Sequence, residues 1–238
     1  ASFGNIFWSG GLQQKIVLSR DKKTKAEKSV LRLGVYGNLK QDINASADLT
    51  RETFTRDDNG YLKIDSVYSE NGVQGNIVYP STIGAGFIYE KSPEIAKGGW
   101  MLGLDYVTSK WSDYRYFGAP DLVRDSKEFH VGAQITPPVV PSRNYWKNVS
   151  YRGGFFTGTD YIDASGKMPV FGVSMGMSLP VLGLKDPQAR YRSQFTVVNL
   201  SLEYIKRGDN SNLVKENLFR FSASFSLSDN WFQKRKYN

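Results

Sequence analysis

The chain has 238 residues and a formal net charge of +8, from 31 Lys and Arg against 23 Asp and Glu. Only 40% of its residues are hydrophobic and no run approaches the roughly 18 apolar residues of a spanning helix, which excludes a bundle of membrane helices. The absence of cysteine excludes disulfides and thiolate metal sites.

Nine segments alternate between apolar and polar residues, and each predicts a strand with one apolar and one polar face. The third segment keeps its phase across Pro80, where we expect a kink or bulge because proline cannot donate to the hydrogen-bond ladder of a sheet. No segment shows a sustained helical period, so the chain is predicted to be all-β. In chain order the segments span residues 5–18, 29–41, 73–90, 99–114, 126–136, 148–158, 168–180, 194–206 and 216–232.

The last segment raises the question of which solvent each face meets. Phe219, Phe221 and Phe225 share one face, and serines such as Ser222 and Ser224 share the other. A soluble sheet would bury the phenylalanines and expose the serines. A membrane barrel would turn the phenylalanines to lipid and the serines to a polar lumen. The period alone leaves both interpretations open.

The polar faces of the other segments favour the barrel. They combine many glycines, such as Gly132 and Gly176, with mid-strand charges of both signs. Exposed strands of a soluble sandwich rarely carry this much glycine, whereas the restricted interior of a barrel accommodates small residues. Large aromatic residues near the strand ends are typical of the aromatic girdles of membrane barrels. We therefore predict an antiparallel, up-and-down transmembrane β-barrel.

Nine polar residues are the candidate lumen-facing or ligand-contacting residues. Charges of both signs in such a wall usually pair with one another or with a plug, but a single cation would also suit an acidic headgroup on a ligand. The nine are Lys15, Arg32, Lys40, Asp105, Glu128, His130, Arg152, Glu203 and Arg220.

Catalysis and cofactor chemistry are not expected. His130 is the single histidine, and no G-x-S-x-G nucleophile elbow and no phosphate-binding loop are present. The basic charges are scattered through loops without an RRM, KH or zinc-finger signature, so nucleic acid is not an expected partner. We predict no enzyme activity, no metal and no cofactor.

Residues 79–114, YPSTIGAGFIYEKSPEIAKGGWMLGLDYVTSKWSDY, resemble the FadL/TodX-type outer-membrane transporters of hydrophobic compounds. In that family a proline precedes a G-x-G-x-x-Y-like strand, which a turn connects to a strand reading W…D-Y…W-S-x-Y. Flanking hairpins extend the resemblance over nearly the whole chain. The matching residues are Pro80, Gly84, Gly86, Tyr89, Trp100, Asp105, Tyr106, Trp111, Ser112 and Tyr114.

The resemblance implies a fourteen-stranded barrel with an N-terminal hatch, of which this chain would supply about nine C-terminal strands and no hatch. Residues 1–232 would form the barrel portion, and residues 233–238 a basic periplasmic tail. The family's C-terminal aromatic signal is matched by Trp231 and Phe232. With the C-terminus in the periplasm, four connections become extracellular, namely 207–216, 158–167, 115–125 and the long 44–71.

The resemblance also implies a function, which is passive uptake of hydrophobic molecules such as long-chain fatty acids across the outer membrane of a Gram-negative bacterium. The expected partners are outer-membrane lipid, lipopolysaccharide and the hydrophobic ligand. Two alternatives remain open. One is a structural or secretion-associated subunit of a larger outer-membrane complex, and the other is a nonspecific polar porin. A stable stoichiometric complex with a larger membrane protein would favour the subunit.

Overall fold

The computed structural model describes residues 2–57, 60–163, 166–181 and 195–228. Extended strands dominate these residues, and the helical pieces among them are two short 3-10 turns, η1 (Trp111–Asp113) and η2 (Tyr145–Asn148). The predicted all-β class is thereby confirmed. Within the described residues, no helix has the length and apolar character needed to cross a membrane.

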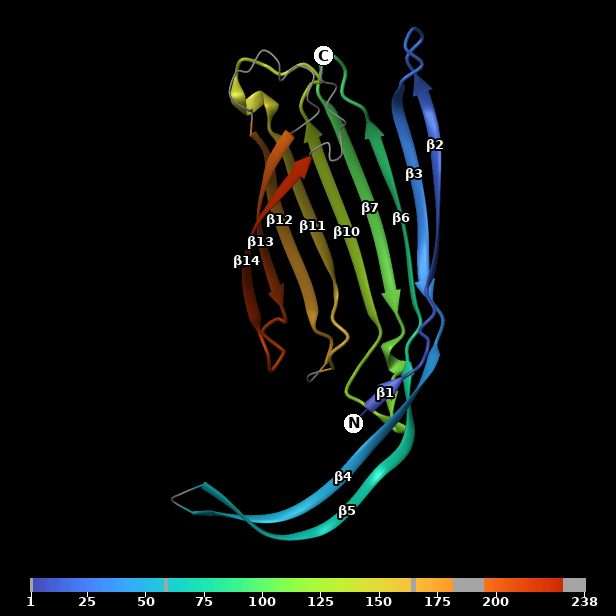
Figure 1. Cartoon of the computed structure of the whole chain (residues 1–238), viewed down its shortest axis with the longest axis vertical. Coiled ribbons are helices and arrows are strands. Elements are labelled where there is room, and N and C mark those ends of the chain that lie inside the picture. Colours follow the sequence, from blue (N-terminus) through green and yellow to red (C-terminus); the bar gives the residue numbers. More distant parts are fainter. Residues whose placement is uncertain (1, 58–59, 164–165, 182–194, 229–238) are drawn as a thin grey trace, which may run out of the picture.

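Nine strands form one antiparallel sheet in which every strand pairs with its neighbour in chain order, apart from an excursion between the second and third (Figure 1). Each of these strands overlaps one of the nine predicted segments, and the antiparallel order of neighbours in the chain is as predicted. The strands are β2 (Gly10–Arg20), β3 (Glu27–Asn38), β6 (Thr82–Lys91), β7 (Gly99–Ser109), β10 (Ser126–Thr136), β11 (Ser150–Thr159), β12 (Pro169–Val181), β13 (Phe195–Arg207) and β14 (Glu216–Ser228).

The sheet is curved but open, so the predicted barrel, of which this chain would supply about nine of fourteen strands, is not confirmed. Its edge strands, β2 and β14, pair with no second neighbour in the described part of the chain. Strand direction alternates along the sheet, so the first and ninth strands run the same way (Figure 1). Closing the sheet on itself would therefore require a parallel seam in an otherwise antiparallel wall. The predicted tail 233–238, with Trp231 and Phe232, lies outside the described residues.

A second, smaller sheet contains the largest departure from the prediction. Residues 44–71, expected as a connection, belong to a long β-ribbon of β4 (Gln41–Asp57) and β5 (Gly60–Tyr79). Figure 1 shows this ribbon leaving the main sheet and bending across below its lower end. Three short strands flank the base of the ribbon, namely β1 (Ser2–Gly4), β8 (Arg115–Tyr116) and β9 (Ala119–Pro120).

Pro80 separates the two sheets. The predicted single strand 73–90 is wrong, because β5 ends at Tyr79 and β6 begins at Thr82 in the other sheet. Proline has no N–H to donate, so the ladder stops there. Pro80 is fully buried, and its carbonyl accepts a hydrogen bond of 2.8 Å from Nδ2 of Asn38. The alternation continues across the break even though the chain changes sheets.

The strand register aligns the apolar residues on one face of the main sheet. Met175 on β12, Leu202 on β13 and Phe221 on β14 stand side by side, with exposed fractions of 63%, 55% and 65%. Few apolar side chains are buried anywhere in the described chain. The sheet therefore has no compact apolar core, and its apolar face is turned outward.

Aromatic rings line this outer face near both ends of the sheet. At the lower end in Figure 1 a continuous row crosses β11 to β14, with ring centroids 5.8 Å apart for Phe155 and Phe171, 6.3 Å for Phe171 and Tyr204, and 4.9 Å for Tyr204 and Phe219. At the upper end Tyr89 and Trp100 lie 5.1 Å apart. The lower row and this upper pair thus place large aromatic residues near strand ends.

Candidate functional site

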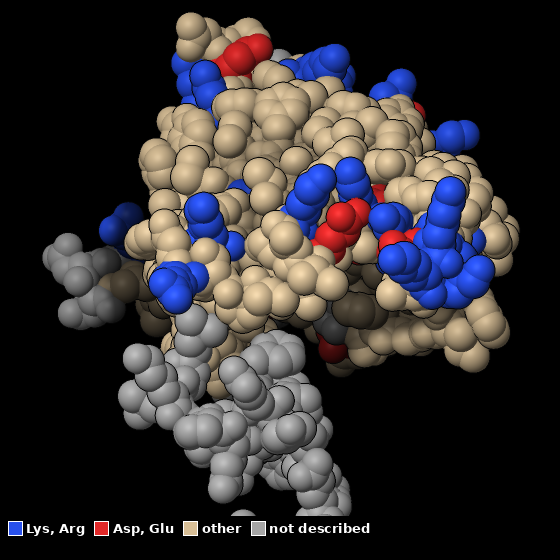
Figure 2. Space-filling model, turned by 90° about the horizontal axis from the view of Figure 1, so that it is seen from above, with Lys and Arg blue, Asp and Glu red and all other residues tan. Residues whose placement is uncertain are grey.

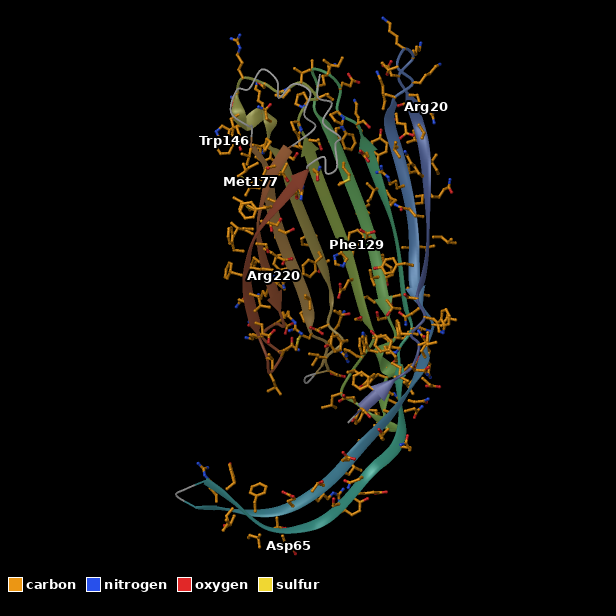
Figure 3. The ribbon with its side chains drawn as sticks, in the orientation of Figure 1. Arg20, Asp65, Phe129, Trp146, Met177 and Arg220 are labelled. Carbon is orange, nitrogen blue, oxygen red and sulfur yellow. The ribbon has the colours of Figure 1, made fainter. Side chains whose placement is uncertain are left out.

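The inner face of the main sheet is the candidate functional site. It is hollowed over β7 and β10 to β14, and the hollow has a volume of about 720 Å³. Figure 3 marks Arg220 on β14, at the edge of this surface. The hollow is lined by glycines and serines together with Asp105, Arg152, Glu203 and Arg220. Its surface therefore carries charges of both signs, on a lining that also includes apolar residues such as Ile88 and Met101.

Eight of the nine candidate residues lie on strands of this sheet. The register pairs Lys15 with Arg32, Asp105 with His130, and Glu203 with Arg220, so the members of each pair share a face. Glu128 and Arg152 follow the same alternation on β10 and β11. Lys40 does not belong to the wall, because it lies in the two residues that link β3 to β4 and the sheet has already ended there.

Most of these charges are paired within the wall. Nη1 of Arg220 lies 3.0 Å from Oε2 of Glu203, and Nζ of Lys15 lies 2.5 Å from Oε2 of Glu27. Arg32 forms an ion pair with Glu90. Such pairs satisfy the charged groups of neighbouring strands. This is the structural role that the sequence analysis gave for charges of both signs in a wall.

His130 also has local partners. Its Nε2 lies 3.0 Å from Oε2 of Glu128, and its ring stacks on Phe156 with centroids 5.4 Å apart. The described residues contain no group of three or more Asp, Glu or His side chains that could hold a metal ion. His130 is therefore held in place by contacts with its neighbours in the wall.

Arg152 begins a ladder of polar contacts that crosses four strands. Its Nη2 donates to Oγ of Ser178 at 2.7 Å, that hydroxyl donates to Oδ1 of Asn199 at 2.6 Å, and Nδ2 of Asn199 donates to Oγ of Ser226 at 3.2 Å. No carboxylate of the described residues forms an ion pair with Arg152. The ladder makes the inner wall hydrophilic across β11 to β14.

The position of Asp105 explains why residue 86, one of the residues on which the sequence resemblance rested, is a glycine. A Cβ on Gly86 would come within 1.9 Å of the Asp105 carboxylate, and a Cβ on Gly84 would come within 2.5 Å of the Tyr36 ring. Both glycines are therefore required by packing on the inner face. Trp111 and Ser112, expected on a strand, lie in the η1 turn.

A cluster at the lower end of the wall was missed by the sequence reasoning. The Asp160 side chain is 7% exposed and accepts a hydrogen bond of 2.8 Å from Nε of Arg207, whose Nη1 lies 2.7 Å from Oε2 of Glu216. The Arg207–Glu216 contact could have been predicted, because these two residues are opposite each other at the end of the last hairpin. The contact of Asp160 could not have been predicted, because this residue follows the end of β11 and lies outside the strand alternation.

An aspartate accepts local hydrogen bonds in the connections at each end of the wall. Figure 2 shows Lys and Arg side chains gathered around the upper end, where the β2–β3 turn lies. In that turn the backbone N–H groups of Thr24 and Lys23, helped by Lys28, lower the pKa of Asp21 to about 2. At the other end the Ser112 hydroxyl and N–H lower the pKa of Asp125.

A family model described as BamG matches residues 9–238. No curated protein and no solved structure matches the chain. The expected relationship to FadL/TodX transporters is therefore wrong. The residues that suggested it have local causes, since Pro80 ends a sheet and the glycines make room for neighbouring side chains.

Proposed function

The chain belongs to the BamG family, and from this premise we propose that it is a wall-forming subunit of a larger outer-membrane complex that assembles outer-membrane proteins. The family is related to the Bam complex, and membership associates the chain with outer-membrane protein assembly and with the outer membrane of Gram-negative bacteria. This is the alternative that the sequence left open beside fatty-acid uptake.

The observation that carries the membrane part of the proposal is the division of the sheet into an exposed apolar face and a polar inner face. A contiguous apolar surface of this kind is costly in water. Its nine strands have 10 to 13 residues, long enough for the 9–11 residues with which a tilted strand crosses a bilayer. We infer that the chain crosses the outer membrane repeatedly and that further strands complete its wall.

The inner face supports a structural role better than the transport of hydrophobic molecules. A site for a fatty acid needs a mostly apolar pocket. The hollow instead mixes apolar residues with glycine and serine and carries charged side chains, including the Glu203–Arg220 ion pair. Membership in the BamG family does not favour the other alternative, a nonspecific polar porin.

The orientation follows from the ends of the strands. The connections 207–216, 158–167 and 115–125 and the β4–β5 ribbon all lie at the same end of the sheet (Figure 1). We assign this end to the cell exterior, as the sequence predicted. The opposite end, where groups of Lys and Arg side chains lie with Asp and Glu among them, would then face the periplasm (Figure 2).

Purification of the tagged protein from detergent-solubilised outer membranes tests the proposal. We expect it to retain the outer-membrane assembly machinery in a fixed ratio, and we expect its depletion to lower the amounts of several unrelated outer-membrane barrels. A protein that purifies alone, and whose loss reduces only the uptake of hydrophobic molecules, would refute the proposal.

A further inference from the structure

The β4–β5 ribbon extends far beyond the strands that support it. The short strand β1 pairs with Asn44–Ser46, and β8 pairs with Ile77–Val78. Beyond these contacts the described residues of 48–74, here called the arm, pair only with each other. At about 3.3 Å per residue, residues 49–57 alone extend roughly 30 Å. An isolated two-stranded ribbon is marginally stable in water, so a surface that packs on the arm would stabilise it.

The departure of the arm from its base is determined by local structure. The strand register shifts between Ala47 and Leu49, and the N–H of Gly72 donates to Oδ1 of Asp48 at 2.8 Å beside this bulge. Gly72 has a φ of +69°, which a residue with a side chain rarely adopts. Bulges bend a ribbon and increase its twist, and two more register shifts follow toward the tip. The arm is thus directed across the lower end of the sheet (Figure 1).

The far part of the arm presents aromatic and aliphatic side chains to solvent. Phe54 and Tyr61 are 60% and 72% exposed, and their rings meet edge to face with centroids 5.2 Å apart. The Arg56 guanidinium lies 5.8 Å from the centroid of the Tyr61 ring. Leu62 on the neighbouring position is 61% exposed. Tyrosine, phenylalanine and arginine are the residues most enriched at protein interfaces.

The charge of the arm is opposite to that of the rest of the chain. Residues 48–74 contain six acidic and three basic residues, although the whole chain has an excess of Lys and Arg. Figure 3 marks Asp65 on the exposed part of the arm. An acidic surface is repelled by the anionic headgroups of an outer membrane and is attracted to a basic protein.

We propose that the arm is a docking surface for a basic patch on a partner protein of the assembly complex. The aromatic pair Phe54–Tyr61 inserts into that patch, and the acidic residues of the ribbon match its positive charge. This inference rests on the proposed function, because it names the surface through which the subunit is held in its complex.

The test compares full-length variants that reach the outer membrane in equal amounts. Double replacement of Phe54→Ala and Tyr61→Ala should lower the amount of assembly machinery recovered with the tagged protein by about tenfold or more. Asp65→Lys should lower recovery as well, and raising the salt concentration should weaken the wild-type complex. Two controls outside the arm, Trp146→Ala at the opposite end and Asp121→Lys in an exposed loop, should retain it.

A crosslinking experiment identifies the partner surface. Because the chain has no cysteine, Leu62→Cys introduces a unique thiol on the arm, to which a thiol-to-amine crosslinker can be attached. We expect a crosslink to lysines of one subunit of the assembly machinery. Normal recovery of the complex by the arm variants would overturn the inference while leaving the proposed function intact. Arm-dependent binding to vesicles of anionic lipid, without a protein crosslink, would also overturn it. A wild-type protein that purifies alone would overturn both.

Discussion

Arginine placed on adjacent residues of β12 provides a sharp test of the two faces of the wall. Met175 is the seventh of the thirteen residues of this strand and points outward, with 63% of its surface exposed. Ser174 lines the inner hollow and is paired in register with Glu203. The substitutions Met175→Arg and Ser174→Arg therefore add the same charge at the same depth, on opposite faces.

The expected difference is large. An arginine facing lipid near the middle of a membrane barrel costs about 2–4 kcal/mol, which corresponds to a roughly 30- to 1,000-fold loss in the equilibrium for the inserted state. The arginine at position 174 would instead lie beside the Glu203 carboxylate in a polar hollow, where we expect a change of less than about 1 kcal/mol.

The measurement is the fraction of each variant that stays in isolated outer membranes after extraction with urea. We expect Ser174→Arg to behave like the wild type and Met175→Arg to be largely extracted or degraded. If Met175→Arg inserts normally while Ser174→Arg fails, the apolar face is not the lipid face and the membrane-wall argument is refuted.

Four further predictions follow from named contacts. Asp160→Asn weakens the contact with Arg207 at the end of β13, so we expect a loss of about 1–3 kcal/mol, seen as a lower urea midpoint; an unchanged midpoint would contradict the role of this cluster. Arg152→Ala removes a side chain that donates a hydrogen bond to the neutral hydroxyl of Ser178, so membrane insertion should persist, and a protein that fails to insert would speak against this assignment. The pKa of Asp21 is lowered to about 2 from its ordinary 3.8, so its stabilisation of the β2–β3 turn is complete above about pH 4 and is lost as the pH falls through 2; Asp21→Asn should abolish that part of the acid titration of stability, and an identical titration in the variant would count against it. Because docking would shield the arm, protease is added to intact cells that carry the Phe54→Ala/Tyr61→Ala variant; it should cleave within 51–63, whereas protection of this range until the outer membrane is opened would reverse the proposed orientation.

The strands were predictable because their alternation is a local property. Each of the nine predicted segments overlaps a strand of the main sheet, and the two faces follow from residue parity alone. Eight of the nine candidate residues lie on strands of this sheet. Lys40 failed because the alternation of 29–41 continues for a few residues after β3 has ended at Asn38.

The ribbon was missed although its pattern is present in the sequence. Ile43, Ala45 and Ala47 alternate with polar residues on β4, but the surrounding Asp, Thr and Asn residues are typical of a loop. Tyr79 and Ile83 share a parity, so the alternation runs through Pro80 without revealing that the chain has changed sheets. Three register shifts in the ribbon weaken the pattern further.

The sequence by itself determined the secondary-structure class, the order of the strands and which side chains share a face, since each of these depends on the geometry of one extended strand. Only the tertiary structure decided that Glu90 forms an ion pair with Arg32, that Asp160 binds Arg207, that β2 and β14 are left as parallel edges, and that β4 and β5 leave the wall as a ribbon. These features depend on which strands become neighbours and in what register. Residues far apart in the chain make those contacts, and the period of a single strand carries no information about them.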